Sequence, residues 1–140
     1  MAAVTAQEAY EELCGYTLGL RDPAFVHQHV VDAFAAQTAD RDTKPIRLAF
    51  ALVGLHLHLE KGLSGRQVQR MHQRLARGQK AWPAFPLPTL HGTLTAADVL
   101  AVPAGPERVQ AIDAWGAAVW AAYQSSHPAV AALLREHGIA

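Results

Sequence analysis

The sequence predicts an all-α protein in which residues 1–140 form a single helical bundle of five to six helices, with a loop rich in proline and aromatic residues packed over it. Two observations support this fold class. No segment alternates polar and apolar residues as a half-buried strand would, and the chain is punctuated by residues that begin and end helices. With 140 residues, of which 51% are hydrophobic, the chain is long enough to build one domain around a single core.

The expected helix starts are marked by capping side chains or by a proline suited to the first turn. They are Thr5 with Glu8, Asp22 with Pro23, Thr43 with Pro45, Ser64 with Gln67, Thr95 with Asp98, Gly105 with Pro106, and Ser126 or His127 with Pro128. The corresponding segments are 5–14, 22–37, 46–61, 64–78, 95–101, 105–124 and 127–138, and Gly15 and Gly19 are expected to bracket a turn after the first. From these segments we expect a bundle of five to six helices.

Two segments define the expected core. Residues 48–59 are apolar nearly all round, which is typical of a buried helix, so we place this helix at the centre of the bundle. Residues 78–92 contain closely spaced prolines that forbid a helix. Apolar side chains lie between these prolines, so we expect this segment to be a loop that packs over the body of the domain.

Charge and cysteine content exclude several classes of function. The formal net charge is zero, which argues against a nucleic-acid partner or an anionic membrane surface. Charged residues or histidines interrupt every apolar run before the roughly 20 residues that a membrane helix needs. The first residues contain early acids and no basic segment followed by an apolar one, so we expect no signal peptide. Cys14 is the only cysteine, and we therefore expect a cytoplasmic protein.

The segment 25–37 places polar groups on a helix that otherwise has core character. Burying such groups without partners is costly, so the cluster indicates a metal, a ligand or a hydrogen-bond network. His27 and His29 are two residues apart, about 200° around a regular helix, so they cannot face the same point. His29 and Asp32 share a face, as do Gln28 and Asp32, and His27 must face elsewhere.

Other polar side chains could complete a site with this segment. His72 is expected on the inward face of its helix, beside Val68 and Leu75. His58 lies near a helix end and is expected to reach solvent. Asp113 is expected to be partly buried with an arginine as its partner.

The leading functional hypothesis is a buried site that binds a divalent metal ion, Zn²⁺, Ni²⁺ or Fe²⁺, formed by His27 or His29 with Asp32 and His72. Bundle proteins build such sites from nitrogen and oxygen groups that several helices send inward. If the site is catalytic, the imidazoles would hold a metal-bound water and Asp32 would orient one of them or act as a base. No His-Glu-x-x-His, Glu-x-x-His or Cys-x-x-Cys pattern occurs in the chain.

Two alternatives stay open. In the first, the protein is a non-enzymatic helical module that forms a homodimer through its tryptophan-bearing face, and the His/Asp/Gln cluster is a structural hydrogen-bond network. In the second, the chain holds a pocket for a small organic ligand, which the loop 82–88 closes.

Several stretches of the chain together resemble a known family. They are Cys14–Leu18, the His-Gln-His-Val-Val-Asp-Ala motif within 25–37, Lys44–Ile46, Leu52–Leu55, Gly65–Gln69 with His72, Trp82-Pro83, Thr93–Thr95, and Trp115 with Val119-Trp120. In these the chain resembles an uncharacterised family of small bacterial proteins, classed as a domain of unknown function. The resemblance implies an intracellular bacterial protein, and it implies no activity, cofactor or substrate.

Overall fold

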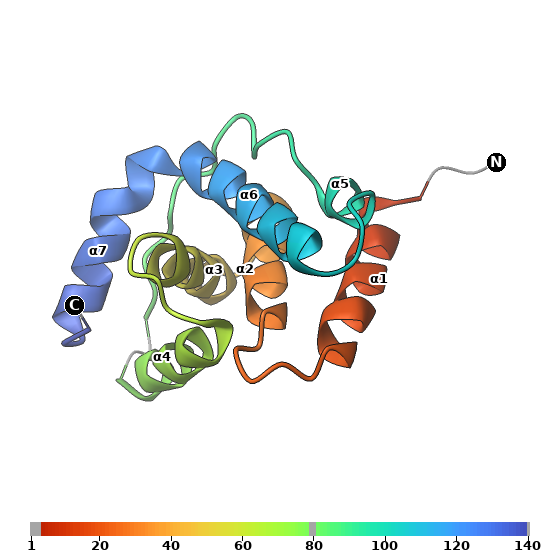
Figure 1. The fold of residues 1–140 in the computed structure, drawn as a ribbon. Coiled ribbons are helices and arrows are strands. Elements are labelled where there is room, and N and C mark those ends of the chain that lie inside the picture. The colour runs from red at the N-terminus through yellow and green to blue at the C-terminus, as the bar shows by residue number, and fades with distance from the viewer. Residues whose placement is uncertain (1–3, 79–80, 140) are drawn as a thin grey trace.

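The structure is a computed structural model that describes residues 4–78 and 81–139, and in these residues it contains helices and no strand (Figure 1). The α-helices are α1 (Ala6–Gly19), α2 (His27–Gln37), α3 (Pro45–Leu59), α4 (Gly65–Gly78), α5 (Ala96–Leu100), α6 (Pro106–Ala122) and α7 (His127–Glu136), with a short 3-10 helix, Gln124–Ser126, before α7. The predicted all-α fold is confirmed. The described residues form seven α-helices rather than five to six, one for each of the seven predicted segments.

Helices α2 and α3 form the centre of the bundle. Helix α2 contacts α1, α3, α4 and α6, and α3 contacts α2, α4, α6 and α7. Figure 1 shows α1 and α7 at opposite ends of the molecule, with α2 and α3 between them. The residues of α3 from Leu48 to Leu55 are almost all buried, which confirms the predicted central position of this helix.

The first helix begins as predicted and ends later. Thr5 and Glu8 form a complete capping box at the start of α1. The helix continues to Gly19, so the predicted turn from Gly15 to Gly19 is wrong. An isolated glycine costs a helix only about 1 kcal/mol relative to alanine, so Gly15 does not by itself end α1.

The second helix begins four residues later than predicted, at His27 rather than at Pro23. Asp22 and Pro23 belong to a turn, in which the backbone N–H of Phe25 donates to the carbonyl of Asp22 (3.1 Å) and the carboxylate of Asp22 accepts from the N–H of Val26 (3.0 Å). Phe25 has a φ of 56°, which a right-handed α-helix does not accommodate. Helix α2 therefore begins after this residue, at His27.

The described part of the loop between α4 and α5, residues 81–95, packs on the bundle as predicted, and positions 79–80 of the predicted loop lie outside the described residues. Phe85 is buried in the core, and the Trp82 ring meets the edge of Phe50 with 5.0 Å between ring centroids. The amide of Gln37 donates to the carbonyl oxygens of Leu94 (2.6 Å) and His91 (3.4 Å), which ties the end of the loop to α2. The loop is thus held by both apolar contacts and hydrogen bonds.

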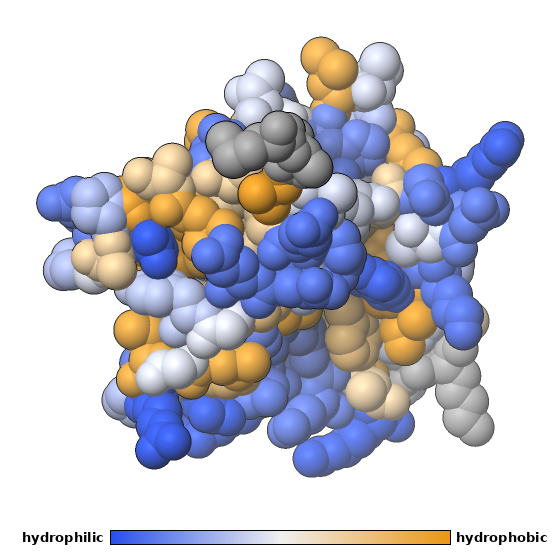
Figure 2. All heavy atoms as spheres, turned by 90° about the vertical axis from the view of Figure 1, so that its right-hand side faces the viewer, coloured by the Kyte–Doolittle hydropathy of each residue, from blue (hydrophilic) through white to orange (hydrophobic). Residues whose placement is uncertain are grey.

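The tryptophans of α6 pack and form hydrogen bonds within the chain. Trp115 and Trp120 are buried, and their indole N–H groups donate to Gln37 of α2 and to Glu60 at the end of α3, both at 2.9 Å. This leaves no exposed tryptophan on α6 for the predicted dimer contact, and the homodimer stays a prediction. Figure 2, which views the molecule from the side of α1, shows separate hydrophobic areas among hydrophilic ones. None of the helices in the described residues has the length and apolar character required to cross a membrane.

Candidate functional site

The polar residues of α2 point to three different places. His27 faces α1, where its Nδ1 lies 2.9 Å from the hydroxyl of Thr17. His29 meets His58 of α3, and Asp32 lies against Gly54 one turn earlier in α3. His29 meets residue 58 of α3, whereas Asp32, which lies later in α2, meets residue 54, which lies earlier in α3. The two helices therefore run in opposite directions. His29 and Asp32 thus share a face, as predicted, at successive levels of the bundle.

His29 and His58 form a parallel stack. Their ring centroids are 3.4 Å apart and the rings are inclined by 16°. His58 is partly buried, and its two nitrogens bond the carbonyl of Leu63 and the carboxylate of Asp113, each at 2.8 Å. The side chain of His58 is 21% exposed, so it reaches solvent only in part, and Asp113 pairs with this histidine rather than with an arginine. The reason is that the end of α3 packs against α6, which carries Asp113.

Asp32 is the most deeply buried acidic side chain of the α2 segment. One oxygen, Oδ1, accepts a hydrogen bond from the amide of Gln28 (3.1 Å), whereas Oδ2 is buried without a partner among the described residues. Burial raises the pKa of Asp32 well above its usual range, and the hydrogen bond from Gln28 lowers it only in part. The site therefore favours the neutral, protonated form of this carboxyl group.

Only glycine at position 54 leaves room for the Asp32 carboxyl group. A Cβ atom on Gly54 would lie 1.9 Å from Oδ2 and 2.5 Å from Cγ of Asp32. The close approach of α2 and α3 at this level thus depends on a glycine in the middle of an apolar helix.

His72 reaches the same region from α4. Its Nε2 bonds the carbonyl oxygen of Phe50 (2.8 Å), and its ring stacks on the ring of Phe50 with 4.9 Å between centroids. Burial lowers the pKa of His72, although the hydrogen bond to Phe50 acts in the opposite direction. A neutral His72 that donates from Nε2 keeps a lone pair on Nδ1, which is free to accept a hydrogen bond or to ligate a metal.

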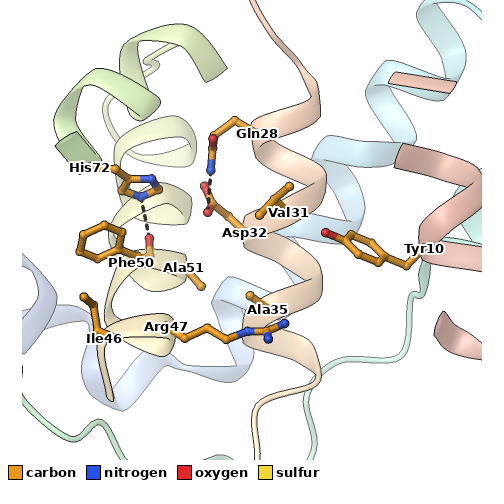
Figure 3. Close-up of a pocket in the computed structure, with 10 residues that line it drawn as sticks. All are labelled: Tyr10, Gln28, Val31, Asp32, Ala35, Ile46, Arg47, Phe50, Ala51 and His72. Carbon is orange, nitrogen blue, oxygen red and sulfur yellow. Dashed lines mark hydrogen bonds between the residues drawn. The ribbon is translucent and has the colours of Figure 1, made fainter. Parts of the chain in front are cut away.

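These groups line a cavity of about 280 Å³ between α1, α2, α3 and α4 (Figure 3). The apolar lining consists of Val31, Ala35, Ile46, Phe50 and Ala51, and the polar lining of Tyr10, Gln28, Asp32, Arg47 and His72. Figure 3 shows the His72 ring and the Asp32 carboxyl group facing the same space from opposite helices. Arg47 is exposed and marks the solvent side of the cavity. We refer to this space as the Asp32 cavity.

The predicted metal ligands are divided by this arrangement. Asp32 and His72 share the Asp32 cavity, whereas His27 bonds Thr17 and His29 stacks on His58. In the described part of the chain, no three or more His, Cys, Asp or Glu side chains are grouped closely enough to hold a metal ion. Besides the hydroxyl of Tyr10, the groups of the Asp32 cavity that could ligate a metal ion are the carboxyl group of Asp32, Nδ1 of His72 and the amide oxygen of Gln28.

Sequence reasoning missed Tyr10, Arg47, Phe50 and Gly54, all of which contact this region. Tyr10 stacks on Phe34 with 3.9 Å between ring centroids, and burial raises the pKa of Tyr10 to about 12, so its hydroxyl stays neutral. The one local signal was Gly54, because a glycine inside an otherwise apolar helix often marks a close approach.

Comparison with known proteins places the chain in a family without assigning it an activity. No curated protein and no solved structure matches the chain. The sequence model of one family, described as a family of unknown function (DUF5946), matches residues 5–124. This range contains every residue that lines the Asp32 cavity, together with the His29–His58 stack and Asp113. The chain belongs to this family of unknown function, DUF5946.

Proposed function

We propose that the protein binds a small organic amine with an apolar body in the Asp32 cavity. The observation that carries this proposal is the buried Oδ2 of Asp32, which has no partner among the described residues. A buried polar atom without a hydrogen bond costs about 1–3 kcal/mol, and a ligand that supplies the missing hydrogen bond recovers this free energy. A cytoplasmic location, which we infer from the single cysteine, suits such a protein.

The lining of the cavity fits an apolar body with one polar end. Apolar side chains from α2 and α3 form the walls, and they include the aromatic ring of Phe50. Ligand sites are commonly built in this way, with few polar groups among apolar ones. The polar groups Gln28, Asp32 and His72 converge at one side of this space (Figure 3).

An amine is the group that best matches Asp32. Rotation about the Cβ–Cγ bond of an aspartate is soft, so the carboxyl group can present one oxygen to a ligand while Gln28 bonds the other. Transfer of the carboxyl proton to solvent then leaves a carboxylate that pairs with an ammonium group. A hydrogen bond between charged groups is about twice as strong as one between neutral groups. Arg47 at the solvent side suits an acidic group at the opposite end of the ligand.

The test compares three probes of nearly equal shape: benzylamine, benzyl alcohol and benzoate. Thermal stabilisation of the protein at millimolar probe concentration is expected for benzylamine and not for benzoate, with about tenfold weaker binding of benzyl alcohol by calorimetry. The para-carboxylate derivative of benzylamine is expected to bind more tightly than benzylamine itself, and Arg47→Gln should remove that gain.

Asp32→Asn provides the matched control, because it keeps the size of the side chain and removes its acidity. This variant is expected to lose the preference for benzylamine. Asp113→Asn, which removes a carboxylate away from this cavity, is expected to keep it. Equal binding of benzylamine and benzyl alcohol, or unchanged benzylamine binding in Asp32→Asn, contradicts the proposal.

A divalent metal ion is the second candidate for this site. The specific observation in its favour is the hydrogen bond from Nε2 of His72 to the carbonyl of Phe50, because metal-bound histidines usually donate their other ring nitrogen in this way. Asp32, Nδ1 of His72 and the amide oxygen of Gln28 would be the protein ligands. Zn²⁺ accepts such mixed nitrogen and oxygen donors.

The metal is tested separately from the amine. Zn²⁺, Ni²⁺ or Fe²⁺ would be retained through purification and would raise the melting temperature, and Asp32→Ala and His72→Ala would abolish both effects. His27→Ala, which alters a histidine that faces α1, would preserve them. Absence of the metal by elemental analysis together with no thermal shift rules out this candidate.

A further inference from the structure

A second, larger cavity lies on the other side of the α2–α3 contact. It has a volume of about 470 Å³ and is lined by residues of the α1–α2 connection, the end of α3, the start of α4, and α6. Its apolar lining includes Leu20, Val26, Leu63 and Val109. We refer to it as the His29 cavity, because the imidazole of His29 forms part of its wall.

His58 provides a fixed positive charge in this wall. Its two ring nitrogens lie 2.8 Å from the carbonyl oxygen of Leu63 and from a carboxylate oxygen of Asp113, and both of these partners accept hydrogen bonds. A ring that donates from both nitrogens is an imidazolium. Burial opposes this charge, but the bonds to Asp113 and Leu63 outweigh burial and raise the pKa of His58.

The stacked His29 must therefore be neutral. Burial, with a further contribution from the charge of His58, lowers the pKa of His29 to about 4. Two imidazolium rings with centroids 3.4 Å apart would repel each other strongly. At neutral pH the ring of His29 thus carries a single proton, on either Nδ1 or Nε2.

The surroundings of the two nitrogens decide where that proton lies. Nδ1 of His29 is buried and has no hydrogen-bond partner among the described residues. Buried N–H groups without acceptors are rarer than buried acceptors without donors, so the proton belongs on Nε2. The side chain of His29 is more than nine-tenths buried and lines the cavity. Unlike Nδ1, its Nε2 is not among the buried atoms without a partner, so His29 presents the Nε2 N–H at the cavity wall.

The charges around the cavity limit the ligand further. Two acidic side chains, Asp22 and Asp113, line it together with the one imidazolium of His58. No lysine or arginine contributes to the lining that the structure describes. Anions are therefore disfavoured. Asp22 accepts from the N–H of Val26 and Asp113 is paired with His58, so the wall group that still needs a partner is the N–H of His29, which requires a hydrogen-bond acceptor on an apolar body.

We propose that the His29 cavity is a second binding site, which takes an uncharged small molecule with an apolar body and a ketone or amide carbonyl that accepts a hydrogen bond from Nε2 of His29. The stack on His58 and the anchoring of His58 by Asp113 and Leu63 hold the His29 ring in place for this contact. This site is independent of the Asp32 cavity and of the amine proposed there.

Acetophenone and ethylbenzene test the carbonyl contact, because they have nearly the same shape and only the former accepts a hydrogen bond. Acetophenone is expected to bind about fivefold more tightly than ethylbenzene, as one neutral hydrogen bond would provide. Benzoate is expected not to bind. In proton–nitrogen correlation NMR of the histidine rings, acetophenone should shift the Nε2 signal of His29.

Three variants separate this proposal from its alternatives. His29→Phe keeps a ring for the stack and should abolish the preference for acetophenone, while Val109→Trp should fill the cavity and block both probes. Asp32→Asn should leave acetophenone binding unchanged, so failure of the amine proposal and failure of this one are distinguishable. Equal affinity for acetophenone and ethylbenzene, or an unshifted His29 signal in the wild-type protein at saturation, overturns the proposal.

Discussion

Replacing Gly54 with alanine tests the contact that shapes the Asp32 cavity. The added Cβ would lie 1.9 Å from Oδ2 of Asp32, so the carboxyl group or the helix must move. Overpacking of this kind costs about 1–3 kcal/mol, and the higher helix propensity of alanine returns about 1 kcal/mol. We expect Gly54→Ala to lower the free energy of unfolding by about 1 kcal/mol.

The double-mutant cycle with Asp32→Ala isolates the cause. Once the carboxyl group is absent, Gly54→Ala meets no clash and should stabilise the protein by about 1 kcal/mol, which gives a coupling of about 2 kcal/mol between the two positions. Gly15→Ala is the matched control, because nothing lies within 4 Å of its added Cβ in α1. It should stabilise the protein by about 0.5–1 kcal/mol.

Urea denaturation followed by circular dichroism measures the free energy of unfolding of the wild type, the two single variants and the double variant of the cycle, and of the Gly15→Ala control. The reasoning is refuted if Gly54→Ala destabilises the protein equally in the presence and absence of the Asp32 carboxyl group. Such a result would place the strain elsewhere along α3.

The pH dependence of stability provides further predictions, each measured as a difference between wild type and variant. The pKa of Asp32 is raised in the folded state, so the stability that this group contributes is complete below its unfolded-state pKa of 3.8. This stability is lost as the pH rises from 3.8 toward the folded-state pKa. Over that interval the free energy of unfolding of the wild type should fall by about 1.4 kcal/mol per pH unit relative to Asp32→Asn. The pKa of His29 is lowered from 6.5 to about 4, so the unfolded state binds the extra proton, and relative to His29→Phe the wild type should lose stability as pH falls from 6.5 to 4. Asp113→Asn removes the negative charge that stabilises the imidazolium of His58, although the amide oxygen can still accept a hydrogen bond. NMR titration should show a lower pKa for His58 in this variant, and an unchanged value would contradict the assigned ion pair.

Local sequence signals predicted much of the fold. The capping boxes at Thr5 and Thr95 and the prolines at positions 45 and 106 mark true helix starts, because caps act within one turn of the chain. Asp22-Pro23 offered the same signal and did not begin a helix. There the side chain of Asp22 caps a turn that Phe25 completes with a positive φ, and nothing in the local composition distinguishes the two outcomes.

The candidate site was only partly predictable for a related reason. Helical periodicity correctly separated His27 from His29, since that relation depends on α2 alone. The pairing of His29 with His58, and of Asp32 with Gly54, depends on the register between α2 and α3, which spacing along one helix does not contain. The contributions of Tyr10 and Arg47 depend likewise on tertiary packing.

The most direct test of the central claim is a count of the protons released when benzylamine binds. Calorimetry at neutral pH in buffers with different ionisation enthalpies gives this number. If the buried, protonated Asp32 pairs with the ammonium group, about one proton should leave the protein for each amine bound, and none in Asp32→Asn. A binding enthalpy that is independent of the buffer in the wild-type protein would contradict this account, in which a protonated Asp32 gives up its proton to pair with the amine.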